Sequence, residues 1–192
     1  MTSQYIKVCR NKRAFNNELF VYQSSFPNKA ELIEIRKPNT LVLSKIDGIP
    51  YLDVPALTDT MVIKLAKTIA KLHSVTHLDD RVLCHWDNQP RNILWNDKQQ
   101  KFYLVDFEDI RLAHPEADIA HLFLFWAENM DCETFTKYTN SFLYAYTEPV
   151  ALNSQRWKRE LHNAIQRFYR RRKRYGKPIK TVTMINPRIV SR

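Results

Sequence analysis

One stretch constrains the fold of this chain more than any other, because polar residues at fixed spacing interrupt two apolar runs within it. Residues 83–95 read Leu-Cys-His-Trp-Asp-Asn-Gln-Pro-Arg-Asn-Ile-Leu-Trp, and residues 102–108 read Phe-Tyr-Leu-Val-Asp-Phe-Glu. The polar segment 96–99 between the runs is typical of a turn, so the two runs predict a β-hairpin. Such a hairpin would bring Asp106 back beside Asn92.

Asp87, Asn92 and Asp106 match a chemical requirement in their type and order. Kinase-type phosphoryl transfer needs a carboxylate that orients the attacking hydroxyl or accepts its proton. It also needs an amide and a second carboxylate to hold the metal ions that bridge the phosphates. Because these residue types also occur together by chance, the motif is a hypothesis that requires structural context.

The segment resembles the aminoglycoside phosphotransferase and choline kinase group within the protein-kinase-like superfamily, over roughly residues 58–130. Glu108 stands where protein kinases favour glycine, and residues 114–120 (His-Pro-Glu-Ala-Asp-Ile-Ala) resemble a P-x-x-D-x-A element of the small-molecule branch. The resemblance implies an α+β, protein-kinase-like two-lobe fold. Its expected parts are a reduced antiparallel-sheet lobe over 1–47, a mainly helical lobe over 48–176 and a basic tail over 177–192.

The resemblance also implies roles for the residues of the motif. Asp87 would orient the acceptor hydroxyl as the catalytic base, and His85 would brace the loop without taking the proton. Assistance by such a base is typically worth about 10²–10⁴ in rate. Asn92 and Asp106 would hold Mg²⁺, with Glu108 assisting them.

A candidate pair for the nucleotide lies near the N-terminus. A strand-like run over 5–8 contains Lys7, and a helix predicted over 14–22 carries Glu18 among its apolar residues. The resemblance implies that such a lysine holds the α- and β-phosphates of ATP and pairs with a glutamate of the next helix. Lys7 and Glu18 are therefore the candidate pair.

The segment 41–48 resembles the hinge of the family, whose backbone amide and carbonyl groups would read the adenine edge, so Ser44 and Lys45 are candidate nucleotide-binding residues. Gly48 is expected to supply an unusual backbone conformation where the chain crosses between the lobes. The glycine-rich loop of the family is missing, since only six residues precede Lys7 and the chain has two glycines. Either the sequence is truncated or the lobe is reduced and the triphosphate more exposed.

Two residues of the loop depart from the family pattern. Trp86 stands where the family often has glycine. Its ring is expected to pack into the lower lobe, and the alternatives are that it narrows the acceptor pocket or stacks on a substrate. Arg91, beside the metal residues, is a candidate for neutralising phosphate charge.

Apolar residues that recur at i, i+3 and i+4 predict helices in the second lobe, each with one buried face. The predicted ranges are 58–74, 118–128, 135–146 and 155–175. Their aromatic stripes are expected to form core and not a cofactor site. His73 is expected to be a packed helix-end residue, and Asp118 a structural acceptor for loop amides.

The formal net charge of +10 is distributed unevenly. Residues 76–135 hold 5 basic and 12 acidic side chains, as expected for a site that gathers Mg²⁺, whereas residues 155–192 hold 13 basic and 1 acidic. Arg170 to Arg174 are five consecutive cations. The first interpretation of this run is a solvated helix face, and the second is a docking site for anionic lipid or nucleic acid.

Cysteine usage and hydropathy predict the compartment. Cys9, Cys84 and Cys132 are widely spaced without a C-x-x-C pattern, which favours free thiols in a reducing cytoplasm. Cys84 is expected to be a buried strand-end thiol and not a nucleophile. No stretch approaches about 18 uncharged apolar residues and no secretory signal is visible, so a cytoplasmic protein without a transmembrane segment is predicted.

These features predict an ATP- and Mg²⁺-dependent phosphotransferase that moves the γ-phosphoryl group to a hydroxyl of a small molecule or sugar-containing metabolite. The alternative is an inactive pseudokinase scaffold whose basic helix binds nucleic acid or an anionic membrane. A protein kinase is a third interpretation, which the Asp-Phe-Glu sequence at 106–108 and the lack of an A-P-E element disfavour.

Overall fold

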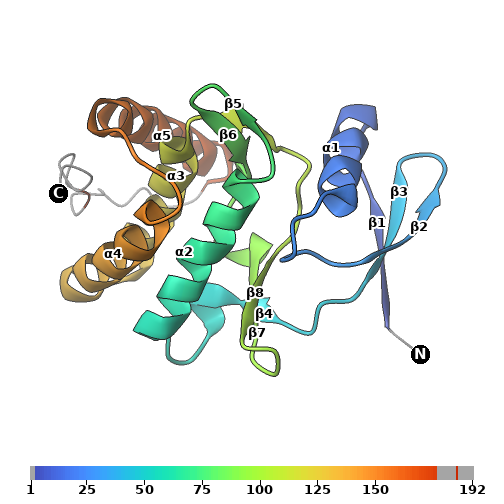
Figure 1. Ribbon diagram of the computed structural model, residues 1–192, viewed down its shortest axis with the longest axis horizontal. Helices are drawn as coiled ribbons and strands as arrows, with labels where there is room; N and C mark the ends of the chain where they lie inside the picture. Colours follow the sequence, from blue (N-terminus) through green and yellow to red (C-terminus); the bar gives the residue numbers. More distant parts are fainter. Residues whose placement is uncertain (1–2, 177–184, 186–192) are drawn as a thin grey trace.

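The computed structural model describes residues 3–176 and residue 185, which form two lobes side by side (Figure 1). The small lobe contains β1 (Gln4–Val8), α1 (Lys12–Gln23), β2 (Leu32–Arg36) and β3 (Thr40–Ser44). Its three strands form an antiparallel sheet in the order β1-β3-β2. The helix α1 faces the second lobe.

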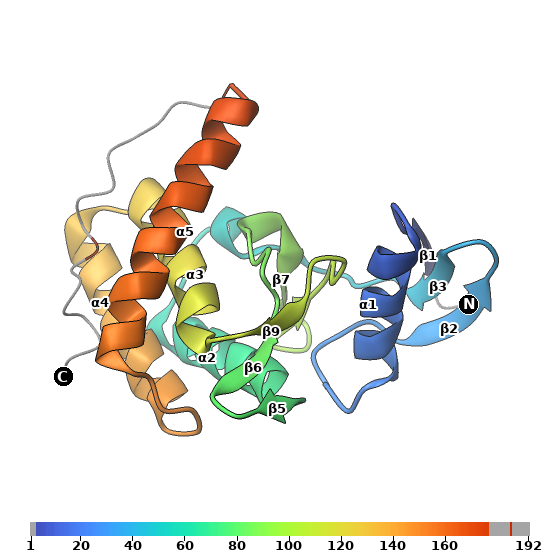
Figure 2. The ribbon, with the colours of Figure 1, turned by 90° about the horizontal axis from the view of Figure 1, so that it is seen from above.

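The second lobe combines four α-helices with two small three-stranded sheets. Its strands are β4 (Ile49–Pro50), β5 (His77–Leu78), β6 (Arg81–Cys84), β7 (Ile93–Asn96), β8 (Lys101–Leu104) and β9 (Arg111–Ala113). Its helices are α2 (Asp59–His73), α3 (Pro115–Asn129), α4 (Cys132–Thr147) and α5 (Ser154–Arg174), with the 3₁₀ turns η1 (Tyr51–Asp53) and η2 (Pro90–Asn92). Figure 2 shows α5 lying alongside α3. The mixture of helices and small antiparallel sheets agrees with the predicted α+β class.

Helix boundaries follow from residues that satisfy the free ends of the backbone. The Thr58 hydroxyl accepts a hydrogen bond from the Met61 amide at the start of α2. Pro115 begins α3, where the missing N–H costs nothing. This proline places the start of α3 three residues before the predicted Asp118. After α5, Gly176 takes the left-handed conformation, with φ of 61°.

The predicted hairpin forms from β7 and β8. The strands pair antiparallel with Ile93 opposite Leu104, and the Asn96 side chain accepts from the Gln99 amide in the turn. Beyond β8, the Val105 amide donates to the Asn92 carbonyl at 3.0 Å. This bond brings the residue before Asp106 against Asn92, as the sequence predicted.

The aromatic stripes of the helices meet in one core. The ring of Phe123 in α3 is fully buried, and four other rings have centroids between 5.3 and 6.2 Å from it. These rings belong to Trp126, Phe135, Phe142 and Trp157. Edge-to-face geometry dominates, which favours aromatic pairs beyond their area of burial. The prediction that the stripes form core is confirmed.

The role expected for Gly48 was wrong. Among the described glycines only Gly176 has a positive φ, so Gly48 does not supply the left-handed conformation that favours glycine. Instead, a Cβ at Gly48 would lie 3.0 Å from the Trp95 carbonyl oxygen and 3.2 Å from the Leu94 Cβ. The glycine is required because the crossing segment passes close to β7.

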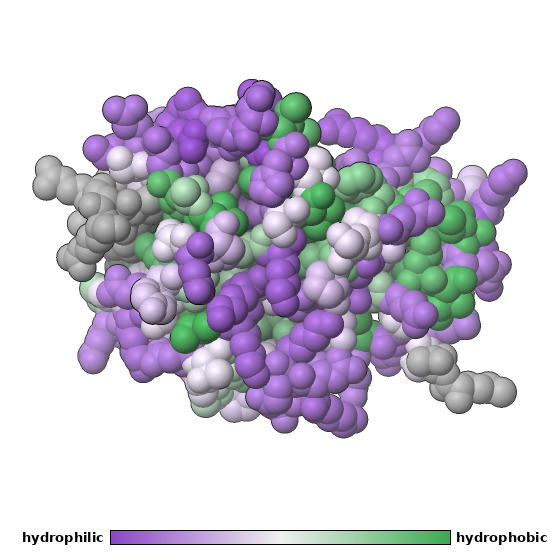
Figure 3. Space-filling model, in the orientation of Figure 1, coloured by the Kyte–Doolittle hydropathy of each residue, from purple (hydrophilic) through white to green (hydrophobic). Residues whose placement is uncertain are grey.

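The small sheet exposes apolar side chains to solvent. Figure 3 shows hydrophobic surface gathered over the small lobe, and its exposed members are Tyr5, Ile6, Val8, Ile33 and Ile35. Within residues 3–176, no helix is both long and apolar enough to cross a bilayer. Most of the predicted basic tail lies outside the described residues, but Ile185 is described and packs against the core.

The substitution Phe123→Ala should lower the free energy of unfolding by about 3–5 kcal/mol, because it removes a fully buried ring and leaves a cavity. Tyr144→Ala is the matched control, since that side chain is 82% exposed and its loss should change stability by less than about 0.5 kcal/mol. Urea denaturation would measure both. Equal effects of the two substitutions would contradict this description of the core.

Candidate active site

Lys7 binds one carboxylate of its own lobe and one carboxylate of the second lobe. Its Nζ lies 2.7 Å from Oε1 of Glu18 in α1 and 2.7 Å from Oδ1 of Asp106. Burial acts to lower the pKa of the Lys7 ammonium, but the two carboxylates outweigh it, so the pKa is raised. Burial raises the pKa of Glu18 to about 7, against the opposing effect of Lys7. The predicted Lys7–Glu18 ion pair is therefore present, and Asp106 is a second carboxylate bound to the same ammonium group.

Asp106 occupies a backbone conformation that turns it out of the hairpin. Its φ is 67°, in the left-handed region that aspartate tolerates better than most residues. The next residue, Phe107, is fully buried, with its ring centroid 5.6 Å from that of Tyr22 and 5.2 Å from that of His85. Phe107 thus anchors the segment, while the Asp106 side chain stays about one-third exposed (36%).

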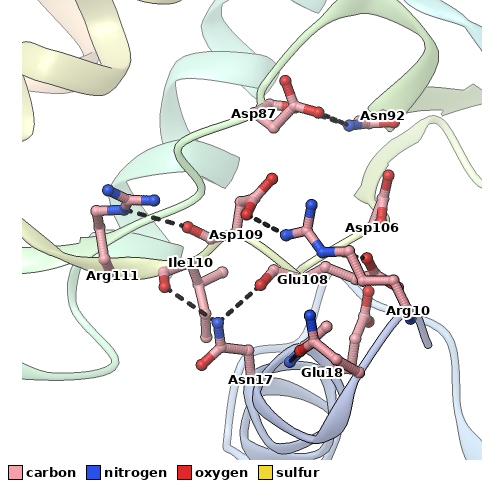
Figure 4. Close-up of polar contacts among 12 residues, drawn as sticks. Arg10, Asn17, Glu18, Asp87, Asn92, Asp106, Glu108, Asp109, Ile110 and Arg111 are labelled. Atoms are coloured by element: carbon pink, nitrogen blue, oxygen red, sulfur yellow. Dashed lines mark hydrogen bonds and ion pairs between the residues drawn. The ribbon is translucent and has the colours of Figure 1, made fainter.

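Asp87 carries hydrogen bonds on both of its carboxylate oxygens. The Oδ1 atom accepts from Nη1 of Arg171 in α5 at 2.6 Å. The Oδ2 atom accepts from the Gln89 side chain at 2.8 Å and from Asn92 Nδ2 at 3.3 Å. Burial acts to raise the pKa of Asp87, but Arg171 holds the pKa below its ordinary value. The Asn92 amide also donates to the Asp87 carbonyl, so the two side chains are locked together (Figure 4).

The loop that carries Asp87 is held from beneath by Asp118. Its buried carboxylate accepts from the backbone amides of His85 at 2.6 Å and Trp86 at 2.8 Å, and it is hydrogen bonded to His73 Nε2 at 3.1 Å. His85 in turn donates from Nε2 to the Val105 carbonyl. These contacts confirm that Asp118 accepts from loop amides and that His73 is a packed helix-end residue, whereas the role of His85 in the site stays a prediction.

A pocket of about 370 Å³ lies between the lobes beside these residues. Lys7, Ser44, Lys45, Asn92 and Asp106 are among its lining side chains. The amides of Ser44 and Lys45 already donate to backbone carbonyls of the small lobe. Neither amide is free to read a base, so any contact from these two residues would use their carbonyl oxygens or side chains.

Glu108 lies deeper between the lobes than Asp106. Arg10 engages both of its carboxylate oxygens, by Nε at 3.1 Å and by the backbone amide at 3.3 Å, and also pairs with Asp109. The Asn17 side chain donates to the Glu108 carbonyl (Figure 4). Glu108 therefore fastens the segment after Asp106 to the small lobe, and its role as a metal residue stays a prediction.

The donor set beside the pocket fits a hard divalent cation. Oxygen atoms of Glu18, Asp106 and Glu108 lie within 4.8 Å of one another. Asn92 uses its side-chain nitrogen to hold Asp87, which leaves the amide oxygen for a ligand. Carboxylate and amide oxygens are what Mg²⁺ prefers. Asn92 and Asp106 both line the pocket, so their side-chain oxygens are candidates for holding Mg²⁺ there.

The sequence did not predict the arginines that surround the loop. Arg170, Arg171, Lys173 and Arg174 are exposed, so the run forms a solvated helix face, and two of its members also pair: Arg171 with Asp87 and Arg172 with Glu128. Trp86 is half-buried and lies outside the aromatic core of the described part of the chain, but its ring packs against residues of the second lobe. Its ring lies between the guanidinium groups of Arg111 and Arg167 at the wall of a second pocket.

One signal for these contacts is present in the sequence. Residues 167, 171 and 174 recur at helical spacing and therefore share one face of α5. Cys84 is a buried thiol at the end of β6, as the sequence predicted, and burial raises its pKa.

Asp118→Asn should lower the free energy of unfolding by about 3–5 kcal/mol, because the new amide places a donor against buried donors and removes the charge that holds them. Asp53→Asn, at an exposed carboxylate, should change stability by less than about 0.5 kcal/mol. Thermal and urea unfolding would measure both. The prediction fails if the two variants unfold alike.

A phosphotransferase family and several solved structures are similar to this chain. Residues 76–152 match the model described as "Phosphotransferase enzyme family". No curated protein sequence matches the chain. An aminoglycoside phosphotransferase of Streptomyces rimosus, in complex with ADP and streptomycin, is 17% identical, with 83% of this chain and 85% of that chain covered and a TM-score of 0.65.

Two further structures extend this similarity. A choline kinase of Streptococcus pneumoniae is 16% identical, with 98% of this chain and 84% of that chain covered and a TM-score of 0.65. An AMP-bound spectinomycin phosphotransferase is 12% identical, with 91% and 82% covered and a TM-score of 0.67. At these identities, the structures define the fold. The chain therefore has the protein-kinase-like fold of aminoglycoside phosphotransferases and choline kinases, and its match to the phosphotransferase family over residues 76–152 confirms the resemblance found in the sequence.

Proposed function

We propose that this protein transfers the γ-phosphoryl group of ATP to a hydroxyl group of a small molecule. One observation carries the proposal: Lys7 lies 2.7 Å from both Glu18 and Asp106, at the wall of a pocket that Asn92 also lines. In kinase-type sites the lysine holds the nucleotide phosphates, and the asparagine and aspartate hold the metal. The similar structures that contain ADP or AMP support the use of an adenine nucleotide.

Each residue has a role that follows from its contacts. Lys7 would bind the α- and β-phosphates, with Glu18 fixing its ammonium group. Asn92 and Asp106 would hold Mg²⁺, which when bound neutralises phosphate charge. Arg91 lines the same pocket and adds a positive charge there. Ser44 and Lys45 line the part of the pocket formed by the small lobe, where the base would lie.

The transfer itself needs a hydroxyl placed by Asp87. The acceptor oxygen forms a bond to the γ-phosphorus while the bond to the bridging oxygen breaks, and ADP leaves with that electron pair. The acceptor proton passes to Asp87 and from there to water. Because Arg171 lowers the pKa of Asp87, this carboxylate is a weak base and acts mainly by orienting the hydroxyl.

An inactive scaffold that binds polyanions through α5 is the competing function. Two of the five cations in its basic run already pair with Asp87 and Glu128, which reduces the charge available to a membrane or nucleic acid. Nucleotide binding that depends on Mg²⁺ separates the two functions, because the scaffold does not require it.

Asp106→Asn should abolish Mg²⁺-dependent ATP binding, and Asp87→Asn should leave it intact while lowering turnover by about 10²-fold or more. Isothermal titration with Mg²⁺-ATP would measure binding, and release of ADP during a screen of hydroxylated metabolites would measure turnover. Asp53→Asn is the control with the same chemical change at an exposed site. Absence of Mg²⁺-ATP binding by the unmodified protein would exclude the proposed phosphotransferase activity.

Arg171→Gln should move the acid limb of the rate–pH profile to higher pH. The pKa of Asp87 is lowered by Arg171, and without that charge burial raises it, so Asp87 is protonated at higher pH. Lys173→Gln removes the same charge from an exposed neighbour on α5 and should leave the limb in place. Identical profiles for Arg171→Gln and the unmodified protein would contradict the assignment of Asp87.

A further inference from the structure

A second pocket, of about 350 Å³, lies on the α5 side of the Asp87 loop. Most of its lining residues are arginines. They are Arg111, Arg167, Arg170, Arg171 and Arg174, together with Trp86, Asp109 and His121. We call this the arginine pocket. Five guanidinium groups and one carboxylate surround a space about as large as the pocket between the lobes.

The positive charge of the arginine pocket is largely uncompensated. Asp109 pairs with Arg10, which lies outside the lining set, and Arg171 pairs with Asp87. Within residues 3–176, no carboxylate lies within 4.0 Å of the other four guanidinium groups (Arg111, Arg167, Arg170 and Arg174). Burial without a matching anion lowers the pKa of Arg111 and Arg167. A ligand with negative charge would neutralise these guanidinium groups and relieve the repulsion between them.

Trp86 fixes two of the arginines in place. The Arg111 and Arg167 guanidinium carbons lie 4.3 and 4.4 Å from its ring centroid, which holds them by cation–π attraction. The ring is presented by a backbone with φ of 66°, and its amide is fixed by Asp118. Because both contacts are made by guanidinium groups, the ring is poorly available for stacking on a nucleic-acid base.

The arginine pocket is connected to the proposed catalytic residue. Arg171 lines it and also donates to Asp87 Oδ1 at 2.6 Å. A guanidinium carries five N–H donors, so Arg171 can bind an anion while it holds Asp87. His121, between the helices, has its pKa lowered to about 4, chiefly by burial, and is neutral near pH 7. The positive charge that an anion would meet in this pocket therefore comes from the arginines and not from His121.

We propose that the acceptor is itself a phosphate monoester, whose phosphate binds in the arginine pocket while a separate hydroxyl lies at Asp87. This rests on the proposed function and names its substrate class. A monoester carries about 1.5–2 negative charges at pH 7, and the guanidinium fork matches its oxygens. The compact pocket suits one such group better than the extended track of a nucleic acid. The product carries two phosphates, and ADP is released.

Titration calorimetry without nucleotide tests this proposal. Glucose 6-phosphate and sn-glycerol 3-phosphate would each be compared with the unphosphorylated parent, alongside inorganic phosphate and phosphatidylglycerol vesicles. A phosphorylated compound should bind at least about tenfold more tightly than its parent, which lacks the charged hydrogen bonds to arginine, and than inorganic phosphate, which lacks the contacts of the organic part. Binding to vesicles alone, or to inorganic phosphate as tightly as to the esters, would overturn the proposal.

Variants locate the binding in the arginine pocket. Arg170→Gln, at an exposed position that should not affect folding, and Arg167→Gln should each weaken binding of the monoester about tenfold. Lys173→Gln removes one charge from the same helix outside the lining set and should change it less than about twofold. Mg²⁺-ATP affinity should be unchanged in all three. Loss of monoester binding with intact ATP binding supports the proposal, and equal monoester affinity in all variants overturns it.

Discussion

The salt bridge from Lys7 to Asp106 is the contact on which the site depends, because its partners come from different lobes. It is buried on the lysine side and shares the ammonium with Glu18, so helix α1, strand β1 and the segment after β8 are positioned together. Arg10 and Asn17 add a second set of bonds to the same segment. The small lobe is therefore bound to the second lobe through Asp106 and the residues that follow it.

The two sides of the loop around Asp87 differ in charge. Toward the small lobe, carboxylates gather around one lysine, which suits a metal ion and a nucleotide. Toward α5, arginines gather around Trp86, which suits an anion. Asp118 supports the backbone between these two environments with its buried carboxylate. The fold thus keeps opposite charges on either side of a loop held in one conformation.

The sequence predicted those parts of the site that are close together along the chain. Asn92 and Asp106 flank one hairpin, whose pairing follows from alternating residues and a turn, and Asp87 lies on the loop that leads into it. Arg171 is 84 residues from Asp87, and helical spacing reveals only which arginines share a face. The direction of that face is fixed by Trp157, Phe168 and the packing of α5 on α3, which no local pattern contains.

The hydrogen bonds on Asp87 limit how an acceptor can approach it. A carboxylate offers roughly four acceptor positions, and Arg171, Gln89 and Asn92 occupy three of them. A hydroxyl must therefore approach along the one direction that remains. In the proposed transfer to a polyol with several equivalent hydroxyls, this geometry would select a single oxygen, so the regiochemistry would be decided by the donors around Asp87 and not by Asp87 alone.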